Sequence, residues 1–184
     1  MTIHRHQIRI RQIGPEINIE LSQPGEERRM RLILVRHGEA APAEVDPTQG
    51  LSETGVRNVE KVASWLSRVG LRPDLIHESG KKRAAQTAEI LARAVAAGRK
   101  PEAVRGLGPQ DPVEEAVEKL DFLEGEVLWV SHLPFLSRVV SRLLIGREEP
   151  ELVRFLPGSA ACLERDSARR WVLLWMVAPG VLCG

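Results

Sequence analysis

The chain carries two histidines at positions suited to ligand binding, each just after an apolar run that is typical of a buried strand. His37 lies between Arg36 and Gly38, and His132 follows the second of these runs. A third predicted strand leads into a helix that carries Arg83. Imidazole and guanidinium groups without a pair of carboxylates favour an anion, above all phosphate, over a metal ion.

These residue types predict nucleophilic phosphoryl transfer. A neutral imidazole nitrogen can attack phosphorus in line while arginines hold the equatorial oxygens, and water then cleaves the covalent phosphohistidine. Gly38 allows a tight turn and a close approach of the backbone to the substrate, so it is predicted to bind substrate together with Arg36, Arg83 and His132. Glu39 and Asp111 are the two candidate general acids, although Asp111 also fits the start of a helix, with Pro112 as the first helical residue. No metal and no cofactor is expected.

The elements that must position these residues alternate between strands and helices from Met30 onwards. Periodicity and capping signals predict the helices, and apolar runs predict the strands. The predicted helices cover residues 52–70, 81–97, 112–123 and 134–146, and the predicted strands cover 32–35, 74–77, 127–130, 159–164 and 170–177. This order predicts a three-layer α/β/α domain with a mostly parallel central sheet, in which ligands bind at the carboxyl ends of strands.

The length of 184 residues fits one domain, which we place at residues 30–184. Residues 1–29 are interpreted as an N-terminal extension that is flexible or precedes a true translation start at Met30. Their apolar residues follow no sustained period, and Gly14-Pro15 and Pro24-Gly25 interrupt them. Ile17, Ile19 and Leu21 alternate and fit a short edge strand.

Charge and composition exclude several classes of protein. The 26 basic and 25 acidic side chains give a net charge of +1, which provides no general attraction to nucleic acid or to an anionic membrane. Two cysteines cannot form a disulfide framework, so a reducing cytoplasm is the expected location. No apolar run is long enough to span a bilayer.

Several motifs together resemble the histidine phosphatase (phosphoglycerate mutase-like) superfamily, and most closely its SixA-type phosphohistidine phosphatases. The resemblance extends from residue 30 to about residue 177, with the motifs in the family's order. The matching segments are Leu34-Val35-Arg36-His37-Gly38-Glu39, Leu51-Ser52-Glu53-Thr54-Gly55, Ser79-Gly80-Lys81-Lys82-Arg83-Ala84-Ala85-Gln86-Thr87-Ala88, Ser131-His132-Leu133-Pro134 and Pro157-Gly158-Ser159-Ala160-Ala161.

The resemblance implies that His37 is the nucleophile, that Arg36 and Arg83 clamp the phosphoryl oxygens, and that His132 donates a hydrogen bond to them. The sequence departs from the family pattern at Gly80, where proline is usual, and at Gln49, where an arginine is often found. It also lacks a clear equivalent of the glutamate that serves many members as general acid.

The predicted activity is dephosphorylation of phosphohistidine on a partner protein. Imidazole leaves readily once protonated, whereas an alkoxide needs a placed acid. Only 48 residues separate Arg83 from His132, which leaves little room for a lid over the site. The alternatives are a small-molecule or broad-specificity phosphomonoesterase and, from another class, a non-catalytic phosphoprotein-binding module.

Overall fold

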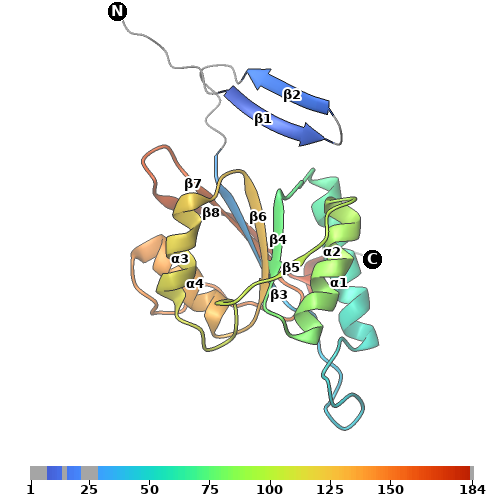
Figure 1. The fold of residues 1–184 in the computed structure, drawn as a ribbon. Coiled ribbons are helices and arrows are strands. Elements are labelled where there is room, and N and C mark those ends of the chain that lie inside the picture. Colours follow the sequence, from blue (N-terminus) through green and yellow to red (C-terminus); the bar gives the residue numbers. More distant parts are fainter. Residues whose placement is uncertain (1–7, 14–15, 22–28, 183–184) are drawn as a thin grey trace, which may run out of the picture.

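A six-stranded sheet forms the centre of the computed structural model, which describes residues 8–13, 16–21 and 29–182. The strands lie in the order β5-β4-β6-β3-β7-β8 (Figure 1). They are β3 (Arg31–Arg36), β4 (Leu75–Glu78), β5 (Glu102–Ala103), β6 (Glu126–Ser131), β7 (Ala160–Arg165) and β8 (Trp171–Val177). The first four strands of this order are parallel, whereas β7 and β8 join antiparallel, so the predicted mostly parallel sheet is confirmed.

Helices cover both faces of this sheet (Figure 1). Helices α1 (Glu53–Arg68) and α2 (Lys82–Val95) pack on one face, and α3 (Val113–Lys119) and α4 (Phe135–Ile145) pack on the other. Side chains of β3 alternate between the two cores, with Ile33 facing α1 and α2 and Leu34 facing α3 and α4. Burial on both faces explains why this strand is a continuous apolar run. The three-layer α/β/α prediction is therefore confirmed.

The capping predictions have mixed outcomes. Ser52 is the N-cap of α1, and its hydroxyl accepts a hydrogen bond from the Gly55 amide at 2.9 Å. Gly146 ends α4 with a left-handed backbone, φ +74°. The prediction that Asp111 caps the third helix is wrong. Its carboxylate instead accepts a hydrogen bond from the Gly108 amide at 2.7 Å, and Pro112, not Asp111, is the N-cap.

The third helix is also shorter than the predicted range. Helix α3 ends at Lys119, and the chain continues as one 3₁₀ turn, η1 (Leu120–Phe122). A last 3₁₀ turn, η2 (Pro179–Val181), follows β8. Within the described ranges, no helix combines the length and the apolar character that a membrane crossing requires.

Two strands of the N-terminal segment lie in the described part of the chain. Strands β1 (Ile8–Ile13) and β2 (Glu16–Leu21) pair antiparallel, with Ile8 opposite Leu21. The predicted strand at Ile17, Ile19 and Leu21 is thus present, but it pairs with β1 in a separate two-stranded sheet rather than at an edge of the central one. The proline-containing breaks at 14–15 and 24–25 lie outside the described residues.

Candidate active site

The carboxyl ends of three adjacent strands bring the predicted residues together. In the sheet, β6 lies between β4 and β3, and Arg36 at the end of β3 is in register with Ser131 at the end of β6. The amide of His37 donates to the carbonyl of Ser131 at 3.1 Å. The two histidine rings consequently contact each other, with centroids 4.7 Å apart between His37 and His132.

The hydrogen bonds of His37 determine which of its ring nitrogens is free to react. Nδ1 lies 2.7 Å from the carbonyl oxygen of Gly38, which can only accept, so Nδ1 carries the proton. Nε2 is then the unprotonated nitrogen, and it accepts a hydrogen bond from Arg83 Nε at 3.2 Å. Burial, with a smaller contribution from the charges of Arg83 and Arg36, lowers the pKa of His37 to about 4. The ring is therefore neutral at pH 7, with its Nε2 lone pair facing a guanidinium group.

His132 is more deeply enclosed, with 2% of its surface exposed. Its Nε2 lies 2.6 Å from the hydroxyl oxygen of Ser79, which follows β4 directly. Its Nδ1 is buried and has no hydrogen-bond partner among the described residues. Burial, followed by the proximity of His37 and the charge of Arg83, lowers the pKa of His132 to about 3. Like His37, this ring is neutral at pH 7.

Two guanidinium groups approach this pair of rings. Arg36 donates from Nη1 to the carbonyl of Phe155 at 2.8 Å, and its Nε is buried without a partner in the described part of the chain. Burial lowers the pKa of Arg36 from its ordinary, very high value. Arg83 donates from Nη1 to the side-chain carbonyl of Gln49 at 3.2 Å. The fork of N–H groups on each arginine is suited to the oxygens of a phosphoryl group.

Gly38 is required at its position by the packing around it. A Cβ atom there would lie 2.7 Å from Val59 Cγ2 and 3.1 Å from the carbonyl oxygen of Gly55. The Gly38 amide donates to the hydroxyl oxygen of Thr87 at 3.0 Å, and that hydroxyl donates to the carbonyl of Arg83 at 2.7 Å. One hydroxyl on α2 therefore connects the loop that carries His37 to the helix that carries Arg83.

No hydrogen bond among the described residues joins either candidate acid to His37 or His132. Glu39 is exposed, and its carboxylate accepts from the Ser52 hydroxyl at 2.9 Å. Asp111 is bonded to the Gly108 amide, as described above. Arg36, His37, Arg83 and His132 do lie together with Gly38, whereas Glu39 and Asp111 are held by other partners.

Sequence reasoning missed three polar contacts at this site. Ser79, Gln49 and Thr87 bind His132, Arg83 and the Gly38 amide, respectively. Ser79 and Thr87 belong to one of the motifs that match the family, and Gln49 is one of the positions that depart from it. The spacing of these residues in the sequence does not reveal which side chains they contact. Among the described residues, no group of three or more histidine, cysteine or acidic side chains is placed to hold a metal ion.

Residues 32–108, which include His37 and Arg83, match the family model of the histidine phosphatase superfamily (branch 1). Solved structures of that superfamily match the fold along most of the chain. Over residues 32–108 the chain therefore carries the sequence pattern of the histidine phosphatase superfamily, and it shares the fold of two SixA-type structures along most of its length. No significant match was found among curated protein sequences.

Two similar solved structures are of SixA type. The protein histidine phosphatase SixA, solved with tungstate, is 26% identical, with a TM-score of 0.74 over 84% of this chain and 100% of SixA. A protein from Agrobacterium tumefaciens, assigned as a phosphohistidine phosphatase SixA, is 27% identical, with a TM-score of 0.67 over 81% of this chain and 97% of that one.

The chain also has the fold of enzymes with other substrates. A phosphoserine phosphatase from Entamoeba histolytica has a TM-score of 0.64 over 84% of this chain and 100% of its own, at 14% identity. That similarity establishes the fold alone, because fold does not determine substrate. These similarities therefore leave the substrate to be argued from the geometry of the site.

Proposed function

We propose that this protein is a histidine phosphatase that removes phosphate from phosphohistidine on a partner protein, through a covalent intermediate on His37. The observation that carries the proposal is the state of the His37 ring. It is neutral, its Nδ1 proton is engaged by the Gly38 carbonyl, and its Nε2 lone pair lies 3.2 Å from Arg83 Nε. An imidazole in this state is a nucleophile beside a cation that can hold the group under attack.

The reaction proceeds in two displacements at phosphorus. The Nε2 lone pair of His37 forms a P–N bond, the P–N bond to the substrate imidazole breaks, and the departing imidazole takes up a proton from solvent. Water then attacks the phosphorus of phospho-His37 and loses a proton to solvent, and the P–N bond to His37 breaks. Inorganic phosphate leaves, and the electron pair of the broken bond restores the Nε2 lone pair. Charge on the three equatorial oxygens has to be stabilised in both steps.

Arg36, Arg83 and His132 supply that stabilisation. The two guanidinium groups provide paired N–H donors, and the unpartnered Arg36 Nε is one of them. In His132, Nδ1 is the ring nitrogen left without a described partner, so it is the one available to a phosphoryl oxygen. A donating Nδ1–H requires that Nε2 accept from the Ser79 hydroxyl, so Ser79 acts as a positioning residue that selects the tautomer.

The choice of phosphohistidine follows from the leaving group. Both candidate acids have other partners, Glu39 with Ser52 and Asp111 with Gly108. A phosphoamidate needs a placed acid least, because imidazole has an ordinary pKa of about 6.5. The two SixA-type structures, each 26% or 27% identical to this chain, support the same substrate class.

The short stretch of chain between Arg83 and His132 favours a protein as the substrate. The chain between Arg83 and His132 completes α2 and then forms β5, α3, η1 and β6, all of which belong to the three layers of the domain. None of these described elements forms a separate lid. A site with an open rim fits a phosphorylated side chain presented by a second protein.

The decisive experiment traps the intermediate. The enzyme is mixed with a ³²P-phosphohistidine protein, quenched at alkaline pH, and the modified residue is assigned by mass spectrometry. We expect label on His37, and no label and no turnover in His37→Ala. The matched control is His77→Ala, a histidine outside the site, which should label normally. Label on another residue would contradict the assignment of the nucleophile, and substrate bound without release of phosphate would favour the binding-module alternative.

Substitution of the two candidate acids, Glu39 and Asp111, tests the class of substrate. Glu39→Gln and Asp111→Asn should each change turnover of phosphohistidine by less than about threefold, since general acid catalysis is worth roughly a hundredfold or more where it operates. A loss of that size on phosphohistidine in either variant would favour the small-molecule phosphomonoesterase, as would faster turnover of p-nitrophenyl phosphate than of the phosphohistidine protein.

A further inference from the structure

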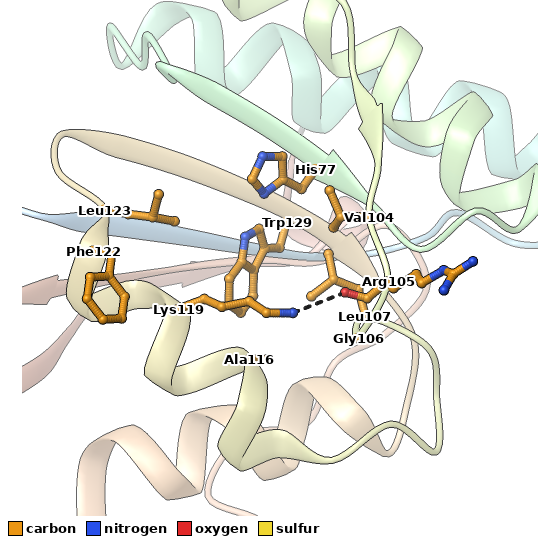
Figure 2. Close-up of a pocket in the computed structure, with 10 residues that line it drawn as sticks. All are labelled: His77, Val104, Arg105, Gly106, Leu107, Ala116, Lys119, Phe122, Leu123 and Trp129. Carbon is orange, nitrogen blue, oxygen red and sulfur yellow. Dashed lines mark hydrogen bonds between the residues drawn. The ribbon is translucent and has the colours of Figure 1, made fainter.

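A cavity lies on the α3 side of the sheet (Figure 2). Its volume is about 560 Å³, and it lies between β4, β6, α3 and the loop at residues 104–107. Volumes of about 300–1,000 Å³ are usual for sites that bind small molecules. None of Arg36, His37, Arg83 or His132 lines it. The carbonyl of Leu107, which accepts from the Ser131 hydroxyl at 2.6 Å, lies on the side toward the candidate active site.

The walls of this cavity are mostly apolar. In Figure 2, Phe122 and Leu123 stand on one side and Val104 and Leu107 on the other, with the Trp129 ring between them. Phe122 is 87% exposed although it is a large aromatic residue. An exposed phenylalanine beside a cavity that contains an indole ring provides a surface for a flat apolar group.

The cavity also contains a buried donor without an acceptor. Trp129 is 2% exposed, and its indole Nε1–H has no hydrogen-bond partner among the described residues. A buried N–H group without an acceptor costs free energy, which a bound acceptor would recover after a small movement of the walls. His77 stands beside Trp129 in the same cavity (Figure 2).

The charged side chains that line the cavity are cations. Lys119 donates from Nζ to the carbonyl of Arg105 at 3.4 Å, a long bond that leaves the other ammonium protons available (Figure 2). The Arg105 side chain is exposed. None of the described residues that line the cavity carries a carboxylate. Glu102, which is in register with His77 on β5, lies outside this lining.

We infer that this cavity binds an amphipathic organic anion, with a flat apolar body against Trp129 and Phe122 and a carboxylate or sulfonate at Lys119. The apolar walls select the body, the indole N–H selects an acceptor atom on that body, and Lys119 selects the charge. The site is separate from the phosphoryl pocket, so both can be occupied at once. The inference does not depend on the substrate proposed above.

The test uses the full chain and two fluorescent probes with the same aromatic body. 8-Anilino-1-naphthalenesulfonate carries an anionic group, and N-phenyl-1-naphthylamine lacks it. Both titrations are run with excess vanadate, which occupies the phosphoryl pocket. We expect saturable binding of the sulfonate and about tenfold weaker binding of the neutral probe, the size expected for one charge-assisted hydrogen bond. Equal affinities would overturn the assignment of an anion.

Variants locate the binding. Lys119→Met should weaken the sulfonate about tenfold, as expected for loss of that charge. The matched control Lys61→Met, on the exposed face of α1, should leave affinity unchanged. Ala116→Leu fills the cavity and should abolish binding. Unchanged affinity in Lys119→Met, which alters a partly exposed side chain and should fold normally, would overturn the inference whatever happens to Ala116→Leu.

Nuclear magnetic resonance gives a direct readout. The chain has four tryptophans, so ¹⁵N labelling gives four indole N–H resonances, and Trp129→Phe identifies the one of interest. The Trp129 resonance should move during the titration. Trp65 and Trp175, whose rings contact each other in the core on the opposite face of the sheet, provide internal controls. Movement of those two resonances without that of Trp129 would contradict the proposed site.

Discussion

Acidification should destabilise this protein well before its carboxylates are protonated. Burial lowers the pKa of His37 to about 4 and that of His132 to about 3, whereas an unfolded histidine has a pKa of about 6.5. Below pH 6.5 the unfolded chain therefore binds more protons than the folded one. The free energy of unfolding must decrease as pH falls.

The magnitude follows from the two shifts. Each histidine that is protonated only in the unfolded state lowers the free energy of unfolding by about 1.4 kcal/mol per pH unit. Two such residues lower it by about 5 kcal/mol between pH 6.5 and 4.5, which is comparable to the whole stability of a small domain. Burial also lowers the pKa of His77, which adds in the same direction. Acidic groups such as Asp166 and Glu164, whose pKa values are lowered, contribute only below their ordinary range.

The assay is urea unfolding at pH 7.0, 6.0, 5.5 and 5.0, compared between the wild type and a His37→Gln/His132→Gln variant. The wild type should lose stability with the steeper slope, by about 2.7 kcal/mol per pH unit more than the variant near pH 5.5. In parallel, the Cε1–H resonances of the two rings should show no titration above pH 5. Equal slopes in the two proteins, or a ring titration centred near pH 6.5, would refute the view that both imidazoles are held neutral by burial.

Three other predictions concern the support of the site. Arg83→Lys should reduce turnover at least about tenfold, because a single ammonium cannot replace a fork that binds both His37 and Gln49. Steady-state kinetics would show this, with Arg93→Lys at the far end of α2 as the control. Gly55→Ala should lower the free energy of unfolding by about 1–3 kcal/mol, because its Cβ would lie 2.1 Å from the Glu39 carbonyl oxygen. Thermal unfolding can compare it with Gly180→Ala, which meets nothing within 4 Å. A chain that begins at Met30 should fold and turn over normally, since β1 and β2 pair with each other and not with the central sheet; circular dichroism and turnover of that chain would reveal any contrary role.

Helices and strands could be predicted from the sequence where the local pattern of residue types agrees with the burial that the whole fold imposes. The run at 32–35 is apolar at every position because β3 is buried on both faces. Ser52 caps α1 because its hydroxyl oxygen can accept from the Gly55 amide while its hydroxyl hydrogen goes to Glu39. The same logic placed His37 and His132 at neighbouring strand ends. Their catalytic roles stay predictions, but the structure puts the two rings in contact.

The prediction for the start of the third helix was wrong because one side chain had two possible hydrogen-bond partners nearby in the chain. Asp111 could cap a helix or close a turn onto the Gly108 amide, and periodicity does not decide between these hydrogen bonds. The contacts of Ser79 with His132 and of Gln49 with Arg83 join residues that are far apart in the chain. Such contacts depend on how strands and loops are placed by the whole fold, so spacing cannot reveal them.

The hydroxyl of Thr87 has a mechanical consequence. It accepts from the Gly38 amide and donates to the Arg83 carbonyl, so α2 and the loop of His37 are joined within one turn of the arginine. A shift of α2 relative to the sheet therefore has to move the Gly38 amide together with Arg83 or break one of these two hydrogen bonds. We expect the two bonds to limit changes in the 3.2 Å separation of His37 Nε2 and Arg83 Nε when the layers move by fractions of an ångström.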